Sequence, residues 1–215
     1  MTQMMTTPAS LHGVWFRQWA TIDGGVRFET QSVVWLQAGP RYADIRVPFH
    51  PAGVARCFAG RSGWDGDQYR WTHELDLEGS DSPAGDDTGH LTFVDGGVIE
   101  HGLFPTVDGP LAYEEMWVPG RASDGPWAAF AAPDACLVRA GGHAITVGDF
   151  RRWGKGFAAR YLVHDAGRWV TRLSIGDTGA LPDPDTSLPP DWRLVGSGHT
   201  GDQDVIPRLE QTWTP

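Results

Sequence analysis

Several features are scarce in this sequence, and each scarcity excludes a class of protein. Among 215 residues there are two cysteines, Cys57 and Cys136, and there is no Cys-x-x-Cys, His-x-His or His-Glu-x-x-His motif. The chain is therefore not a disulfide scaffold, and the spacing of the two cysteines neither requires nor excludes a single bridge. The simplest interpretation is two buried, reduced thiols. We expect no metal site.

Positive charge is also scarce: the chain has 17 Lys and Arg but 27 Asp and Glu, which gives a net charge of −10. Nucleic acids and anionic membranes attract clustered Lys and Arg, so we expect neither as a partner. No apolar run approaches the roughly 20 residues that span a bilayer. Residues 1–11 show no basic region followed by an apolar run. We therefore expect a cytoplasmic protein.

The chain lacks the common motifs of nucleotide and nucleophile chemistry. It contains no Gly-x-Ser-x-Gly and no glycine-rich phosphate loop. Triad-type and nucleotide-dependent reactions are not expected, and we predict no cofactor.

Turn-forming and large aromatic residues are abundant: the chain has 28 Gly, 16 Pro and 11 Trp, and no segment has a helical period. Residues 68–77 alternate, with Tyr69, Trp71, His73, Leu75 and Leu77 on one face, which predicts a half-buried strand with His73 inside. Further strands are predicted at 14–20, 33–37, 42–47, 55–59, 91–94, 98–104, 113–118, 127–131, 136–139, 144–150, 157–163, 168–175, 192–197 and 208–213.

The two halves of the chain resemble each other. Residues 35–39 and 43–46 match 137–141 and 145–148 at an offset of 102; residues 58–61, 70–75 and 113–119 match 157–160, 168–173 and 209–215 at offsets of 99, 98 and 96. Matches in one order with shrinking offsets are what an internal duplication with shortened loops would leave. We therefore predict an all-β chain of two similar antiparallel β-barrels or barrel-like sandwiches, at residues 1–119 and 120–215.

Six segments also carry a family resemblance: VVWLQ at 33–37, YADIRVP at 42–48, CFAG at 57–60, WTH at 71–73, DTG at 87–89 and YEEMW at 113–117. They resemble the lipocalin-like (calycin-like) proteins, whose fungal members contain two lipocalin barrels in one chain and which have bacterial relatives. The resemblance implies a two-barrel fold and a small apolar ligand. It brings no catalytic residues with it.

Comparison of the halves identifies inner positions that packing alone does not require. His73 corresponds to Thr171 and Glu115 to Gln211, whereas the neighbouring Trp71 stays tryptophan. A buried imidazole and a buried carboxylate shift each other's protonation, and such pairs concentrate at functional sites. His73 and Glu115 could instead pair with each other, or with backbone, as a satisfied polar cluster.

We therefore predict that the N-terminal barrel carries the ligand site and that the C-terminal barrel is a degenerate copy serving as scaffold. The main hypothesis is binding of a small, largely apolar molecule. The alternative is a cofactor-independent cyclase, isomerase or lyase with His73 and Glu115 as an acid–base pair. A third possibility is a protein adaptor. The predicted ligand-binding residues are Trp35, Arg46, Tyr69, Trp71, His73, Tyr113, Glu115 and Trp117.

Two local questions stay open. On strand 42–47, Asp44 and Arg46 share one face while Ala43 and Ile45 share the other. Alternation makes the apolar face the core and leaves Asp44 and Arg46 as an exposed pair. If the strand faces the other way, Arg46 becomes an anchor for a ligand carboxylate. Glu100 and His101 are adjacent in sequence, so only one of them can be internal.

Overall fold

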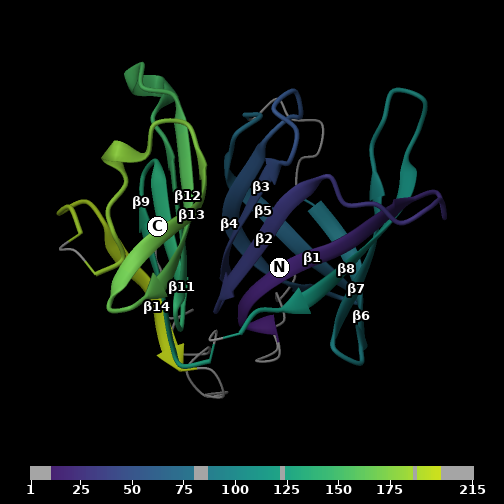
Figure 1. Ribbon diagram of the computed structural model, residues 1–215, viewed down its shortest axis with the longest axis horizontal. Helices are drawn as coiled ribbons and strands as arrows, with labels where there is room; N and C mark the ends of the chain where they lie inside the picture. The colour runs from purple at the N-terminus through teal and green to yellow at the C-terminus, as the bar shows by residue number, and fades with distance from the viewer. Residues whose placement is uncertain (1–10, 80–86, 122–123, 186–187, 200–215) are drawn as a thin grey trace.

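The computed structural model describes residues 11–79, 87–121, 124–185 and 188–199. This part of the chain contains fourteen β-strands, joined by turns and short 3-10 helices. They form two units that lie side by side (Figure 1). The all-β prediction is confirmed.

The first unit is a closed barrel. Its eight strands pair in sequence order, each antiparallel to the next, and β1 closes the barrel by pairing with β8. Closure leaves no free sheet edge. The strands are β1 (Gly13–Ile22), β2 (Gln31–Ala38), β3 (Arg41–Pro48), β4 (Arg56–Asp65), β5 (Gln68–Asp76), β6 (Asp87–Val94), β7 (Gly97–Phe104) and β8 (Leu111–Pro119).

The second unit is a six-stranded antiparallel sheet, in the order β13-β12-β11-β10-β9-β14. The prediction of two similar barrels is therefore not confirmed: β13 and β14 each pair with one neighbour, so the described sheet stays open. Closing a barrel requires the two end strands to pair. The strand predicted at 208–213 lies outside the described residues. The strands are β9 (Pro126–Ala132), β10 (Ala135–Ala140), β11 (His143–Asp149), β12 (Phe157–Asp165), β13 (Arg168–Ile175) and β14 (Arg193–His199).

The matched segments fall on corresponding strands of the two units. Residues 35–39 and 43–46 fall on β2 and β3 and the turn between them, and the matching segments of the second half fall on β10 and β11. The strand registers agree with this match, because Ala43 pairs with Leu36 in the barrel as Ile145 pairs with Val138 in the sheet. The match of 58–61 with 157–160 is wrong by three residues, because the ladders place Ala59 opposite Ala43 and Tyr161 opposite Ile145. Internal duplication itself stays a prediction.

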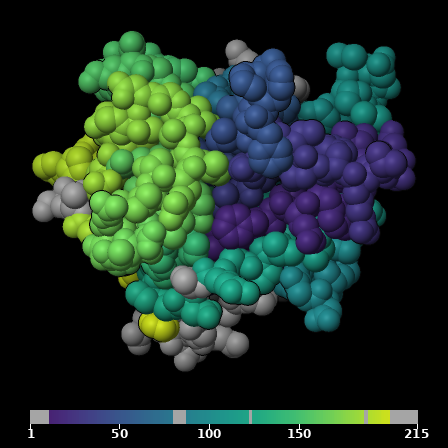
Figure 2. Space-filling view, in the orientation of Figure 1, coloured from purple at the N-terminus to yellow at the C-terminus, as the bar shows by residue number. Residues whose placement is uncertain are grey.

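The barrel and the sheet pack through corresponding faces. β10 lies against β2 and β11 against β3, and the buried side chains between them form one apolar layer. Figure 2 shows the two units in contact along a continuous boundary. The layer includes these pairs of corresponding positions: Val34 and Cys136, Leu36 and Val138, Ala38 and Ala140, Ala43 and Ile145, Ile45 and Val147, Cys57 and Ala159, and Ala59 and Tyr161. Both cysteines are buried and free.

This packing explains why alternation predicts the wrong exposure for Asp44 and Arg46 on strand 42–47. Ala43 and Ile45 do face a core, but it is the layer between the units, so the opposite face of β3 points into the barrel. Asp44 is 3% exposed, and Arg46 lines the barrel cavity. The prediction of an exposed Asp44–Arg46 pair is wrong because both faces of β3 are buried.

A β-bulge in β5 changes which side chains face inward. Ala59 pairs with Leu75 and Gly60 with His73, so Glu74 has no partner across the ladder. The extra residue reverses the alternation. The alternation predicts Leu75 and Leu77 on the same face as His73. They pack instead against the apolar layer between the two units, and Asp76 turns toward His73.

Candidate functional site

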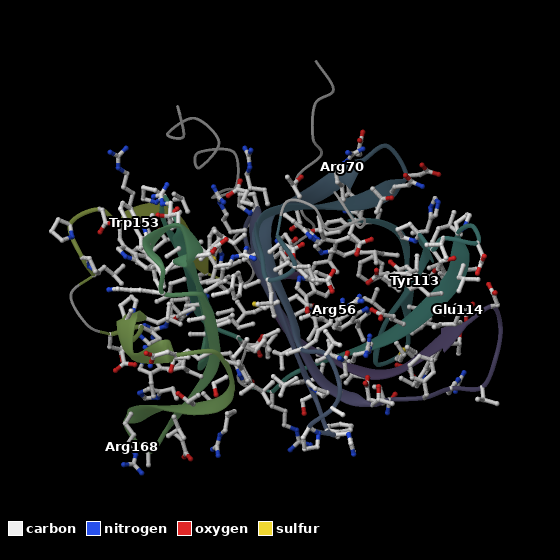
Figure 3. The ribbon with its side chains drawn as sticks, turned by 90° about the horizontal axis from the view of Figure 1, so that it is seen from above. Arg56, Arg70, Tyr113, Glu114, Trp153 and Arg168 are labelled. Carbon is white, nitrogen blue, oxygen red and sulfur yellow. The ribbon has the colours of Figure 1, made fainter. Side chains whose placement is uncertain are left out.

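The barrel encloses a cavity of about 560 Å³. It opens at the end where β1 joins β2, β3 joins β4 and β7 joins β8, and the first and last of these connections project on the right of Figure 1. Viewed from above, Arg56 and Tyr113 lie in the barrel, with Glu114 at its outer side, and Arg168 lies in the sheet (Figure 3). The volume lies within the range of small-molecule sites, roughly 300–1,000 Å³.

The opposite end of the barrel is filled by aromatic side chains. Trp35 lies at the centre, with its ring 5.9 Å from that of Trp15, 5.7 Å from that of Trp71 and 5.6 Å from that of Trp117. These rings close the base of the cavity.

Apolar side chains gather around the mouth. Of the twelve large exposed hydrophobic residues in the described part of the chain, eight lie on the three connections at this end or beside them. Single exposed apolar residues are ordinary, but a contiguous group marks an interaction or ligand site. The eight are Ile22, Val26, Phe28, Phe49, Val54, Leu103, Phe104 and Val107.

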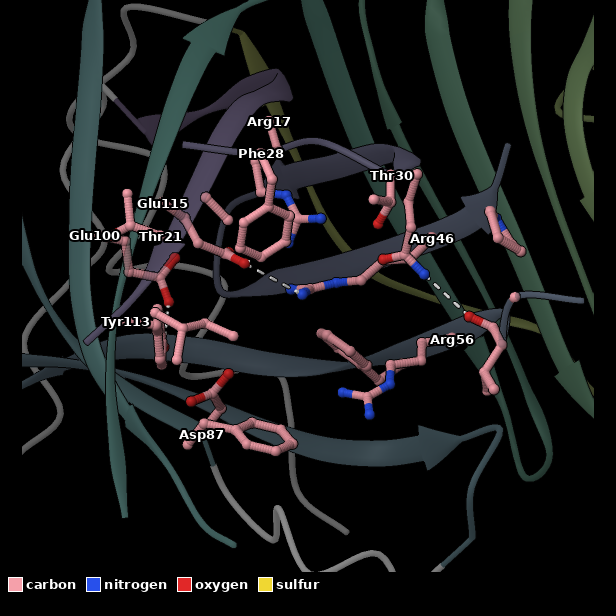
Figure 4. Close-up of a pocket in the computed structure, with 18 of the residues that line it drawn as sticks. Arg17, Thr21, Phe28, Thr30, Arg46, Arg56, Asp87, Glu100, Tyr113 and Glu115 are labelled. Atoms are coloured by element: carbon pink, nitrogen blue, oxygen red, sulfur yellow. Dashed lines mark hydrogen bonds and ion pairs between the residues drawn. The ribbon is translucent and has the colours of Figure 1, made fainter. Parts of the chain in front are cut away.

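Two buried arginines cross the cavity below the mouth. Arg46 donates through Nε and Nη2 to Asp44, at 2.9 and 3.3 Å, and its Nη1 lies 3.5 Å from Glu115. Arg17 donates through Nε and Nη2 to Glu29, at 2.8 and 3.0 Å, and through Nη1 to Glu115. Figure 4 shows Arg46 and Glu115 pointing toward each other across the cavity.

Every nitrogen of both guanidinium groups therefore faces a carboxylate. Burial alone would lower the pKa of Arg46, but the charges of Asp44 and Glu115 raise it well above its ordinary value. Arg46 therefore stays protonated, and the carboxylates of Asp44 and Glu115 balance its charge. It is not the free anchor for a ligand carboxylate that the inward orientation of β3 would otherwise suggest.

Two further carboxyl groups lie beside this cluster without an ion-pair partner among the described residues. Glu100 on β7 is 4% exposed and accepts hydrogen bonds from the Tyr113 hydroxyl, at 2.7 Å, and from Trp117 Nε1, at 3.0 Å. Burial raises the pKa of Glu100 well above its ordinary value, and the charges of Glu115 and Asp87 raise it further. Burial likewise raises the pKa of Asp87, against the opposing effect of Arg46.

His73 and Glu115 line the same cavity, but they have different partners. His73 Nδ1 lies 2.9 Å from Asp76 Oδ2, and the imidazole stacks on Phe58 with the ring centres 4.4 Å apart. In the neutral tautomer that donates its Nδ1 proton to Asp76, the other ring nitrogen, Nε2, is a hydrogen-bond acceptor. Nε2 is buried and has no hydrogen-bond partner among the described residues.

The eight predicted ligand residues divide into two groups. Arg46, His73, Tyr113 and Glu115 line the main cavity. Trp35, Trp71 and Trp117 line only a narrow extension at its base, and Tyr69 is fully buried in the aromatic cluster, where its hydroxyl donates to Ser62.

Sequence reasoning missed Arg17, Asp87 and the inward Asp44, and it left Glu100 undecided. Glu100 is the internal member of its pair with His101, whose Nδ1 lies outside, 3.3 Å from Glu114. Alternation with the buried Val98 on the same strand was the available signal. Arg17 could not be assigned to the inner face of β1, because a bulge directly after it interrupts the alternation of that strand.

Two kinds of feature are absent from the described residues. No group of three or more His, Cys, Asp or Glu is arranged to hold a metal ion there. No helix in this part of the chain has the length and apolar character needed to cross a bilayer.

Comparison with known proteins gives a likeness of fold. No protein-family model and no curated protein sequence matches the chain. The fold is similar to the crystal structure of an uncharacterised protein from Saccharomyces cerevisiae, with a TM-score of 0.70 and 16% identity, over 86% of this chain and 98% of that one. At this identity the likeness concerns the fold alone.

Proposed function

We propose that the barrel binds a small molecule whose apolar body lies near the mouth and whose polar end reaches the charged cluster. The observation that carries the proposal is the cavity of about 560 Å³, with apolar residues at its entrance and a few convergent polar groups at depth. Ligand cavities commonly have this composition. The buried Tyr42 hydroxyl and His73 Nε2, both without partners, further support it, because a bound polar group would satisfy them.

The barrel topology supports a finer assignment, to the lipocalin-like proteins. Eight antiparallel strands in up-and-down order, closed between the first and the last, are the arrangement of lipocalins, which bind small ligands inside the barrel. The sheet then serves as a scaffold that covers one side of the barrel.

A neutral apolar fluorophore, N-phenyl-1-naphthylamine, tests the binding proposal. We expect saturable, one-to-one fluorescence enhancement, with quenching of the tryptophans at the base. Ala20 lines the cavity and pairs with Glu115 across the ladder, so Ala20→Phe should occupy ligand space and weaken binding at least about tenfold, or about 1.4 kcal/mol.

Ala112→Phe is the matched control, because Ala112 is exposed on β8. Binding should be unchanged in this variant. Absence of saturable binding to the wild-type protein, or equal weakening in both variants, would overturn the proposal.

A second candidate function is proton-transfer catalysis without a cofactor. It is favoured by the Asp76–His73 hydrogen bond and by the raised pKa of Glu100, because together they place an oriented base and a protonated acid in one cavity. Incubating a bound ligand with wild-type and His73→Ala protein, followed by mass spectrometry and NMR, tests it. Recovery of the ligand unchanged from the wild-type protein would exclude catalysis on that compound.

A further inference from the structure

Deep in the cavity, the charged hydrogen-bond donors are all paired with carboxylates, whereas some of the carboxyl groups have no cation as a partner among the described residues. The charged donors there are Arg17 and Arg46, and all six of their nitrogens face Asp44, Glu29 or Glu115. Arg56, at the mouth, pairs with Glu78 at 3.2 Å. Among the described residues, a ligand carboxylate or phosphate would meet no arginine or lysine below the mouth that is not already paired with a carboxylate.

Acceptors remain available in the same place. Glu100 and Asp87 have no ion-pair partner among the described residues, and both line the cavity. His73 Nε2 has no hydrogen-bond partner among the described residues, on a side chain only 8% exposed, and it is an acceptor in the neutral ring that donates Nδ1–H to Asp76. Carboxyl groups buried without a cation are costly unless they hold a proton or meet a positive group.

We propose that the polar end of the ligand is a protonated amine, held between the carboxyl groups of Glu100 and Asp87 with His73 Nε2 as a neighbouring acceptor. This inference rests on the proposed function and names its ligand class. An ammonium group supplies three N–H donors and one positive charge, which match two carboxylates and one imidazole nitrogen. The remaining length of the ligand extends toward the apolar mouth.

Binding of an amine should release a proton. Burial keeps the pKa of Glu100 and of Asp87 above the ordinary values, so the empty cavity holds protons that an ammonium group displaces. The groups that face this pair are Glu115 on β8, which raises both pKa values, Arg46 on β3, which lowers both, and His73 on β5, whose protonated form lowers that of Asp87. Amine affinity should therefore rise with pH between about 5 and 8, below the ordinary pKa of an alkylamine.

The test uses three compounds with the same chain, n-decylamine, n-decanol and decanoate, which compete with N-phenyl-1-naphthylamine for the full-length protein. We expect decylamine to displace the fluorophore at a concentration at least about tenfold lower than decanol, with decanoate the weakest. Isothermal titration in buffers of different ionisation enthalpy should show proton release on amine binding only.

Two variants locate the preference. Glu100→Gln keeps hydrogen-bonding atoms for Trp117 and Tyr113, and Asp87→Asn provides a second, independent change. In each, the advantage of the amine over the alcohol should fall below about threefold while decanol binding persists. The matched control is Glu114→Gln, because Glu114 is exposed on β8, and it should keep the full advantage.

The outcomes separate this inference from the proposed function. Decanoate competing as well as decylamine, or an amine advantage that survives in both variants, would overturn the inference while fluorophore binding keeps the proposed function intact. A wild-type protein that does not bind the fluorophore would overturn the proposed function, and the inference with it.

Discussion

At the scale of single residues, Glu100 shows how a buried carboxyl group is tolerated without a cation. Each of its two oxygens accepts one hydrogen bond, from Tyr113 and from Trp117, which leaves further acceptor sites on the carboxyl group. Hydrogen bonds do not replace the lost hydration of a full charge, and the nearby carboxyl groups of Asp87 and Glu115 add repulsion. Proton uptake is therefore the favourable solution in the empty barrel.

The raised pKa of Glu100 makes stability depend on pH. A carboxyl group whose pKa is higher in the folded than in the unfolded chain keeps its proton longer in the folded state. The free energy of unfolding therefore falls as pH rises from the ordinary glutamate value of 4.5 toward the raised value. We expect Glu100→Gln to remove this loss, so the stability of the variant relative to wild type should increase with pH by up to about 1.4 kcal/mol per unit.

Urea unfolding of both proteins at pH 5, 6 and 7 measures this difference. Glu114→Gln, which changes an exposed carboxyl group on β8, should follow the wild-type curve. Parallel curves for Glu100→Gln and wild type would show that Glu100 ionises as freely in the folded chain as in the unfolded one.

Four of the eight predicted ligand residues line the main cavity and three line its base, whereas the prediction omitted Arg17 and Asp87 and made Asp44 exposed, and the reason is local. His73 and Glu115 could be identified because their counterparts in the second half are neutral, so packing does not require a titratable group at either position. Asp44 and Arg46 could not be placed because β3 is buried on both faces, and alternation identifies an inner face only when the other meets water.

At the scale of elements, the bulge in β5 determines the environment of His73. It reverses the alternation after His73 and brings Asp76 within 2.9 Å of the imidazole. Gly60 on β4 makes room for it: a Cβ atom there would lie 1.9 Å from the Thr72 carbonyl oxygen and 2.9 Å from the Glu74 nitrogen. Both obstacles are backbone atoms, so they cannot move aside as a flexible side chain can.

We expect Gly60→Ala to destabilise the protein by at least about 2 kcal/mol, because β4 and β5 must separate or the bulge must shift. Urea unfolding measures the loss. Gly179→Ala is the matched control, since the nearest atom to its Cβ would be a side-chain oxygen of Asp177 at 3.3 Å, and it should change stability by less than about 0.5 kcal/mol. Similar losses in the two variants would mean that close packing at Gly60 does not limit stability.

The positions of the strands could be predicted from the sequence, but the bulge could not. Each of the fourteen strands in the described residues overlaps a predicted one, because glycine- and aspartate-rich turns mark the boundaries between them. A bulge is a single extra residue inside a strand. In the sequence, Leu75 and Leu77 continue the apolar alternation of Trp71 and His73. The alternation therefore conceals the bulge and predicts the wrong face for both leucines.

At the scale of the whole molecule, the barrel and the sheet pack against each other through strands at matching positions in their sequence order. Corresponding residues of β2 and β10, and of β3 and β11, line one shared apolar layer, which is the geometry of an interface built from one surface used twice. Sequence comparison predicts that the two halves correspond. It could not show which face each half presents to the other, or that the described second sheet stays open.

This layer should couple the unfolding of the two units. Ile45 on β3 is fully buried against the sheet, so Ile45→Ala should cost about 2–5 kcal/mol through lost burial and the cavity left behind. Since β11 loses the same contacts, its amide groups should exchange hydrogen faster by the same free energy as those of β3. Val54→Ala, which shortens an exposed side chain at the mouth, is the control and should leave both strands unchanged. Faster exchange confined to β3 would show that the barrel opens independently, and would leave the shared layer with no role in joining the units into one cooperative structure.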